Sequence, residues 1–228
     1  MSEIVKSPRP DHETLHHALV ERMVADLRPV RRLWPVRARL ALWIALEAGV
    51  LLLLIGNGHR SDLAAQLGNP WYLLGVVGFA LAGAVSAAFA LRSAIPGREP
   101  SATEIGVLAV LAGASALLLL KEPLNTSVPL ASFIGTGLRC ALEIAIFAAL
   151  PCVALLWAVR RGAPLAAGFD GALVGAGAFL FSFALMRVRC PLDEGLHLLV
   201  WHLIPALAGI ALAAFLGTML FRRRRIRD

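Results

Sequence analysis

Charged side chains are scarce in this sequence. Only 16% of the 228 residues are Asp, Glu, Lys or Arg, whereas soluble domains carry about 25%. Hydrophobic residues make up 58% of the chain, and the mean hydropathy is +0.74. This composition excludes an ordinary soluble globular domain.

The sequence also lacks the motifs of soluble-type enzymes. It contains no Walker phosphate loop, no Rossmann glycine fingerprint, no HExxH zinc motif and no GxSxG nucleophile elbow. We therefore expect neither an enzyme nor a resident cofactor.

Long apolar runs fill most of the chain, each close to the roughly 20 residues that cross a bilayer core. The six runs cover residues 40–56, 71–91, 103–120, 138–159, 164–186 and 198–221. They leave little chain for a separate globular domain. The sequence thus predicts an all-α, polytopic membrane protein. Its six-helix transmembrane bundle would span residues 40–221, between a segment at 1–39 and a basic tail at 222–228.

Most of the positive charge lies on one side of these runs. The net charge is +7, and 17 of the 22 Lys and Arg residues fall on the side of the termini. Eight precede the first run, two follow the second, two follow the fourth and five follow the sixth. Cytoplasmic loops are enriched in Lys and Arg, so both termini are predicted to be cytoplasmic, with their arginines at the acidic inner leaflet. This distribution argues against direct nucleic-acid binding.

Residues 1–39 are predicted to be a retained cytoplasmic segment, because the first apolar run starts too late and is too long for a signal peptide. Asp11 is a candidate N-cap of a helix, and Pro29 would end that helix by disfavouring helical backbone at Arg28. Between them an apolar residue recurs every four positions, which predicts an amphipathic helix of about four turns. The stripe consists of Leu15, Leu19, Met23 and Leu27.

Such a short helix is marginal in water and needs a surface to pack against. The surface could be the bilayer, the protein's own loops or another protein. The polar positions mix acids with bases, unlike the Lys- and Arg-rich polar face of a typical interfacial helix. This mixture favours a protein partner.

Small residues and a few charges lie inside the predicted spans. Small residues let helices approach closely in lipid, so the glycines are predicted to form packing seams; they include Gly75, Gly78, Gly83, Gly171 and Gly175. Arg139 and Glu143 are four residues apart and are predicted to pair. Glu47 and Asp170 are intramembrane acids, which are functional candidates by default, although the sequence assigns them no role.

The three cysteines differ in their predicted depth. Cys140 and Cys190 lie near the ends of predicted spans on the outer side, whereas Cys152 lies near the middle of the membrane. Two cysteines on the oxidising side can form a disulfide, and a cysteine in mid-span is usually a small buried apolar residue. A stabilising disulfide, two unremarkable thiols and a metal site all remain open.

Histidines follow the second outer cysteine. His197 and His202 come seven and twelve residues after Cys190, and His59 lies in the first outer loop. Thiolate and imidazole together suit soft or borderline metals. No CxxC motif is present, so a metal site would rest on Cys140, Cys190 and His197.

Four stretches resemble the six-span NrsF-like family, whose members negatively regulate extracytoplasmic-function sigma factors in bacteria. They are ADLRPVRRLWP before the first span, RCALEIAIFAALP in the fourth, RRGAPL before the fifth, and Cys190-Pro191 followed by Trp201. In order and spacing they cover almost the whole chain. Cys152 is not part of the family pattern, and His202 stands where the pattern has an aromatic residue.

The resemblance implies a membrane-bound anti-sigma factor in the bacterial inner membrane. Its N-terminal segment would hold an extracytoplasmic-function sigma factor away from RNA polymerase. The residues expected to bind it are Leu15, Leu19, Met23, Leu27, Arg28 and Pro29. Cys140 and Cys190 match the family's two outward cysteines, which are implicated in sensing heavy metal or oxidative stress; a heavy metal would bind only transiently.

Two other functions are compatible with a six-span protein. A membrane thiol oxidoreductase would ordinarily need a vicinal cysteine pair, and the sequence has none. A small metabolite or ion carrier would show matching Gly/Pro-broken helices in two halves, but Pro151 and Pro205 do not form such a match.

Overall fold

The computed structural model describes residues 12–25, 33–122, 124 and 128–222. The chain divides into two units, residues 1–33 and 34–228. The first unit contains one helix, α1 (His12–Ala25), on which Leu19 and Met23 are 57% and 64% exposed. The predicted N-terminal helix therefore exists. Asp11, Leu27, Arg28, Pro29 and the side chain of Leu15 lie outside the described residues.

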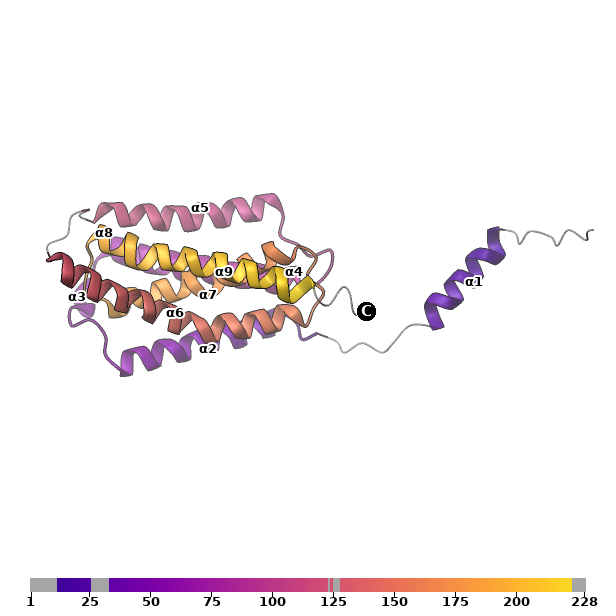
Figure 1. The fold of residues 1–228 in the computed structure, drawn as a ribbon, viewed down its shortest axis with the longest axis horizontal. Helices are drawn as coiled ribbons and strands as arrows, with labels where there is room; N and C mark the ends of the chain where they lie inside the picture. Colours follow the sequence, from indigo (N-terminus) through magenta and orange to yellow (C-terminus); the bar gives the residue numbers. More distant parts are fainter. Residues whose placement is uncertain (1–11, 26–32, 123, 125–127, 223–228) are drawn as a thin grey trace, which may run out of the picture. The chain divides into compact units, whose positions relative to one another are not determined.

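The second unit is a bundle of long helices, and its described residues contain no strand (Figure 1). Six helical segments are long and apolar enough to cross a membrane, which confirms the predicted all-α class. They are α2 (Val36–Gly56), α4 (Pro70–Ser93), α5 (Ala102–Leu118) with the 3-10 turn η1 (Leu119–Lys121), α6 (Leu130–Arg160), α7 (Ala167–Arg189), and a last segment built from α8 (Gly195–Leu198), the π-helical turn η2 (Leu199–Leu203) and α9 (Ile204–Arg222). A short helix, α3 (Leu63–Leu67), precedes α4.

Two spans begin at least four residues earlier than the apolar runs predicted. The first begins at Val36, so Arg37 and Arg39 lie inside α2 and not in the segment before it, and the fourth begins at Leu130 instead of residue 138. Pro35 and Pro129 occupy the N-cap positions of these helices. Proline suits the start of a helix, because its φ is preset and the first N–H groups need no intrahelical partner.

Helix α7 lies at the centre of the bundle. In its most apolar window 72% of the residues are buried, against 17% in α2 and in α5, and it packs most extensively against α9 and α4. Figure 1 shows α5 and α2 along opposite edges of the bundle, with α7 between them. The outward faces carry exposed leucines and valines, for example Leu52 and Val110, as expected for helices that face lipid.

Most of the glycines predicted to lie at close helix–helix contacts do so. A Cβ atom on Gly175 would lie 2.7 Å from the Cβ of Ala213 in α9, and one on Gly83 would lie 2.9 Å from the carbonyl oxygen of Gly177 in α7. Gly171 also packs against α9, and Gly78 against Ser115 in α5. For Gly75 the prediction is wrong: a Cβ there would have no neighbour within 4 Å.

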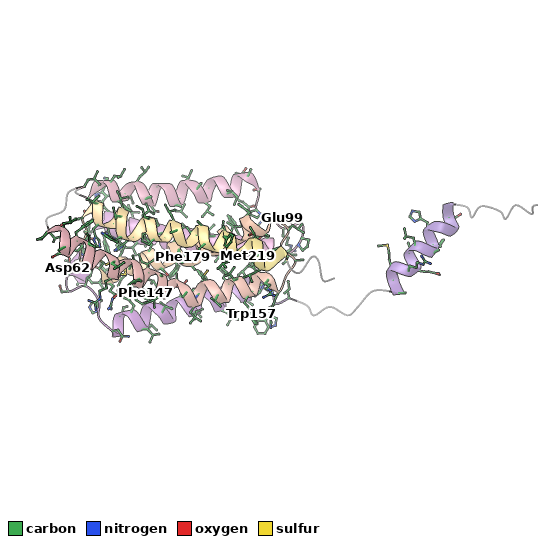
Figure 2. The ribbon with its side chains drawn as sticks, in the orientation of Figure 1. Asp62, Glu99, Phe147, Trp157, Phe179 and Met219 are labelled. Carbon is green, nitrogen blue, oxygen red and sulfur yellow. The ribbon has the colours of Figure 1, made fainter. Side chains whose placement is uncertain are left out.

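The even number of long helices places the start of α2 and the end of α9 at the same end of the bundle. We call this the arginine end; it also carries the connections 94–101 and 161–166. The opposite end, with the connections 57–69 and 190–194, is the cysteine end. Asp62 marks the cysteine end in Figure 2, and Glu99 and Trp157 mark the arginine end.

Candidate functional site: a buried cysteine–histidine cluster

Four side chains from three parts of the chain meet near the cysteine end. Cys140 lies in the third turn of α6, Cys190 directly follows α7, His197 lies in α8, and His202 lies in the π-helical turn η2. Their ligand atoms all lie within 4.8 Å of one another. We call these four residues the cysteine–histidine cluster.

The cluster brings together residues that are distant in sequence. The Sγ atoms of Cys140 and Cys190 are 3.7 Å apart, and the Sγ atom of Cys190 lies 3.5 Å from Nε2 of His197. Both thiols are free. The structure therefore brings together all three residues that the sequence suggested for a metal, with their ligand atoms within 4.8 Å of one another.

His202 joins the cluster because its helix is locally π-helical. His202 is five positions after His197, and in a regular α-helix this spacing would turn the two side chains about 140° apart. In a π-helical turn the backbone bonds run from residue i to i+5, so residues five apart face the same side. The two imidazole rings accordingly lie 5.2 Å apart. His202 was noted in the sequence analysis but not included in the candidate metal site, because nothing in the local sequence indicates the π-helical turn.

The cluster is shielded from solvent by apolar side chains. All four of its residues are buried, and Ile144 and Met186 pack against the two cysteines. The ring of Phe133 meets His197 edge to face at 6.1 Å, and Phe183 meets His202 at 5.7 Å.

The histidines have unused hydrogen-bonding atoms. Nδ1 of His197 and both ring nitrogens of His202 find no hydrogen-bond partner among the described residues. A buried polar atom without a partner costs about 1–3 kcal/mol. These nitrogens therefore point to a ligand that would satisfy them.

Two separations between donor atoms match those around a tetrahedral metal ion. Bonds of about 2.3 Å to sulfur and about 2.05 Å to nitrogen give tetrahedral edges of about 3.8 Å between two sulfurs and about 3.6 Å between sulfur and nitrogen. The observed distances are 3.7 Å and 3.5 Å. Two thiols and two imidazoles form a donor set that suits Zn²⁺ and softer ions, so the residues present fit such an ion.

Hydrogen bonds favour the thiolate form of Cys190. The Cys140 thiol donates to the Cys190 sulfur, and this bond, together with the contact to His197, lowers the pKa of Cys190 well below its ordinary value against the opposing effect of burial. The thiolate is the form of cysteine that binds metals and attacks oxidants.

Comparison with known proteins identifies the family. Residues 23–223 match the family model described as NrsF, negative regulator of sigma F. The chain belongs to the NrsF family. No curated protein and no solved structure matches it. As a member of the NrsF family it is a negative regulator with a sigma factor as its partner, and the resemblance seen in the sequence is confirmed.

One feature of the NrsF match bears on the N-terminal helix. The matched range begins at Met23, so Leu15 and Leu19 precede it, whereas Met23, Leu27, Arg28 and Pro29 lie within it. The family pattern thus includes only the last residues of α1 and the chain that follows.

The remaining cysteine and His59 lie apart from the cluster in this NrsF-family chain. Cys152 packs in the main hydrophobic core of the bundle, and His59 is exposed in the connection after α2. Cys140 lies ten residues along α6, about 15 Å from the start of the helix. The sequence placed this cysteine near the start of its span, and that placement is wrong because α6 begins at Leu130.

The charged residues singled out in the spans also lie outside the cluster. Arg139 pairs with Glu143 at 3.7 Å, but Glu143 has a closer partner in Arg189, at 2.8 Å. Both carboxylate oxygens of Glu47 are buried without a hydrogen-bond partner among the described residues. Asp170 accepts a hydrogen bond from the backbone N–H of Ala166 and so supports the start of α7.

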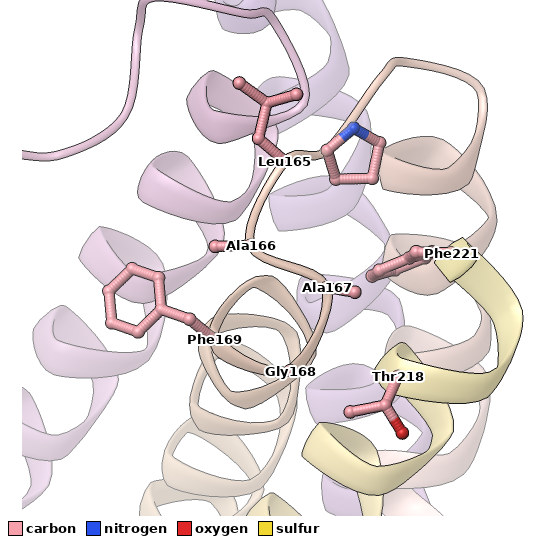
Figure 3. A pocket seen from close by; sticks show the side chains of 8 residues that line it. Leu165, Ala166, Ala167, Gly168, Phe169, Thr218 and Phe221 are labelled. Atoms are coloured by element: carbon pink, nitrogen blue, oxygen red, sulfur yellow. The ribbon is translucent and has the colours of Figure 1, made fainter. Parts of the chain in front are cut away.

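A separate pocket lies at the arginine end of the NrsF-family bundle (Figure 3). Its volume is about 360 Å³, and it is formed by residues 164–169, which enter and begin α7, together with Thr218 and Phe221 of α9. Thr218 supplies the only side-chain hydroxyl in this lining, and its oxygen donates to the carbonyl of Phe215. The lining holds no titratable or metal-binding side chain, so the cysteine–histidine cluster is the stronger candidate site.

Proposed function

We propose that this chain is a membrane-bound anti-sigma factor with a sensor in its transmembrane bundle. It holds an extracytoplasmic-function sigma factor at the bacterial inner membrane through residues 1–39. It releases the sigma factor when a metal ion or an oxidant reacts at the cysteine–histidine cluster. The match to the NrsF family over residues 23–223 carries the proposal, and the buried set of four ligands supports the sensing role.

Charge supports the orientation in the membrane. The arginine end holds Arg92, Arg98, Arg160 and Arg161, and five more arginines lie in the sequence from Arg222, the last residue of α9, to Arg227. With this end in the cytoplasm, the chain obeys the enrichment of Lys and Arg in cytoplasmic loops. The cysteine end then lies on the outer side, where oxidants and toxic metals arrive first.

The exposed apolar side of α1 supports a protein partner. Leu19 and Met23 are exposed, and a short helix with an uncovered apolar stripe is marginal without a surface to cover it. A sigma factor covering this stripe would be kept from RNA polymerase. Arg28 and Pro29, which follow within the matched range, belong to the same proposed contact.

The cluster supports sensing of a metal more directly than sensing of an oxidant. With an ion bound, the two cysteines and two histidines would be held at fixed separations, and the partnerless nitrogens would gain a ligand. Hydrogen peroxide would instead convert the two thiols into a disulfide and form two molecules of water. That reaction draws the sulfurs from 3.7 Å to about 2.05 Å and leaves the histidines unsatisfied.

The test uses the full-length protein with its sigma factor in native membranes. Met23→Asp places a charge on the apolar stripe, and His17→Asp places the same charge on an exposed polar position of the same helix. A buried charge without a partner is strongly unfavourable. We expect Met23→Asp to free the sigma factor into the soluble fraction and raise sigma-dependent transcription, whereas His17→Asp retains it.

Two results would contradict the proposal. Purification of the wild-type chain from membranes without any sigma factor would refute the anti-sigma role. Retention of the sigma factor by Met23→Asp would show that the stripe is not the contact. Quinone reduction that depends on Cys140 and Cys190 would favour the thiol oxidoreductase, and solute uptake by vesicles containing only this protein would favour the carrier.

A further inference from the structure

The chain on either side of Cys190 is bound to the chain that leaves α2. The backbone N–H of Arg60 donates to the carbonyl of Val188 at 3.2 Å, and Nη1 of Arg189 donates to the carbonyl of Gly58 at 2.8 Å. Nη1 of Arg60 also donates to Oδ1 of Asp193 at 3.0 Å. Cys190 thus lies between residues that hold the connection after the first span.

Buried charges hold the same two segments together. Arg60 is only 3% exposed and pairs with both Asp62 and Asp193, while Asp193 pairs with Arg187 at 2.7 Å as well. The ring of Tyr72 faces the guanidinium groups of Arg60 and Arg187 at 5.5 Å and 5.0 Å. The hydrogen bond from Arg60 lowers the pKa of Asp62 well below its ordinary value, so this pair stays charged at neutral and mildly acidic pH.

Arg189 connects this region to the other cysteine. Its Nε atom donates to Glu143 at 2.8 Å, and Glu143 lies three residues after Cys140 in α6. One side chain therefore bridges the helix that carries Cys140 and the end of α2, directly beside Cys190. We call Arg60, Arg187 and Arg189, with Asp193 and Glu143, the arginine clamp.

Helix α2 buries few of its own side chains in the bundle. Only 17% of its most apolar window is buried, and its fully buried side chains are Trp43, Glu47 and Leu54. It is also the helix that follows residues 1–33 in the chain. The arginine clamp therefore joins the chain around Cys190 to the residues that follow α2.

We propose that Arg60 and Arg189 transmit the state of the cysteine–histidine cluster to α2, and through α2 to the N-terminal segment. The inference rests on the proposed function, because it needs a signal at the cluster and a sigma factor at the N-terminus. A ligand shifts a conformational equilibrium only through contacts that differ between two states. The clamp supplies these contacts, because it joins both cysteine-bearing segments to one end of α2.

The test separates binding at the cluster from release of the sigma factor. Full-length protein with bound sigma factor is reconstituted in vesicles, and Cd²⁺ is added. The ultraviolet absorption of cadmium–thiolate bonds reports binding, and sedimentation of the vesicles reports how much sigma factor is released. Arg189→Gln removes the bridge between α6 and the end of α2. Arg139→Gln is the matched control, because Arg139 also pairs with Glu143 but is 79% exposed.

We expect all three proteins to give the cadmium–thiolate absorption. Arg189→Gln should release at least about fivefold less sigma factor than the wild type, which is the lower end of typical coupling between sites. Arg139→Gln should release as much as the wild type. If Arg189→Gln does not accumulate, Arg60→Lys replaces it, since lysine keeps the charge but cannot hold two carboxylates as a planar guanidinium does.

The outcomes distinguish this inference from the proposed function. Normal release by the clamp variant would overturn the inference and leave the proposed function standing. Equal losses of cadmium binding and release would also overturn it, because the arginines would then only support the cluster. A wild-type protein that binds Cd²⁺ and keeps its sigma factor would overturn the proposed sensing role, and the inference with it.

Discussion

At the cysteine end of the bundle, Arg60 and Arg187 are buried and paired with acids, whereas Arg92 and Arg161 at the opposite end are more exposed. Arg60 and Arg187 are nearly inaccessible and share Asp193. At the other end Arg92 and Glu104 form an ion pair in which each side chain is about one third exposed, and Arg161 lies 3.6 Å above the exposed ring of Trp157.

The difference in exposure follows from what surrounds the arginines at each end. Arginine beside an exposed aromatic ring suits the membrane interface, where the ring is amphipathic and the charge stays hydrated. A buried ion pair needs good geometry to offset its loss of hydration, so it fixes the positions of its partners. Basic residues at one end can therefore set orientation, while those at the other end hold the segments around Cys190 in place.

The largest effect is expected from the two cysteines of the cluster. Cys140→Ser and Cys190→Ser should each abolish release of the sigma factor by Cd²⁺ while basal repression stays intact, because each removes one soft ligand. The double variant should be no worse than either single one. Cys152→Ser is the control, since Cys152 lies in the main core. A sigma-dependent reporter measures the response, and loss of the response in Cys152→Ser alone would contradict the assignment.

The ion pairs at the two ends should differ in their contribution to stability. Asp193→Asn leaves Arg60 and Arg187 short of a buried counter-charge and should lower the free energy of unfolding by about 3 kcal/mol, the low end for a broken buried pair. Glu104→Gln removes the same charge at the arginine end and should change stability little, because exposed pairs contribute little. Unfolding of both variants in detergent measures their free energies of unfolding. Similar losses of stability would show that the ion pairs at the two ends contribute equally.

A smaller effect, on Cd²⁺ affinity, is expected from replacing His202, the fourth residue of the cluster. His202→Phe replaces an imidazole by a ring of similar size and should weaken Cd²⁺ binding about tenfold, which corresponds to about 1.4 kcal/mol. Formation of a disulfide between Cys140 and Cys190 by hydrogen peroxide should be unaffected. Titration of the cadmium–thiolate absorption gives the affinity. Unchanged affinity would mean that His202 does not ligate the ion.

Much of the fold could be predicted from the sequence, because membrane-spanning length is a property of single apolar runs. The start of α6 could not be placed in this way, since Gly135 and Gly137 dilute the apolar signal of its first turns. In the folded chain Gly137 makes room for the ring of Trp201, a contact between segments more than 60 residues apart.

The cysteine–histidine cluster was only partly predictable, because it too depends on contacts between residues that are distant in the sequence. Cys140, Cys190 and His197 were suggested by residue type and by their place near one predicted face. The contribution of His202 depends on one π-helical turn, and the contact of Arg189 with Glu143 joins residues 46 apart. Neither leaves a local pattern in the sequence.

The π-helical turn also changes the rotation of one part of the last span relative to the other. Before the turn, His197 faces the cysteines; after it, Ala213 and Gly217 face the glycines of α7. A continuous α-helix would fix these two faces at one angle, set by 100° per residue. The π-helical turn contains one residue more than an α-helical turn, so the residues after it face a different direction. His197 therefore faces the cysteines, and Ala213 faces α7, at an angle that a continuous α-helix would not provide.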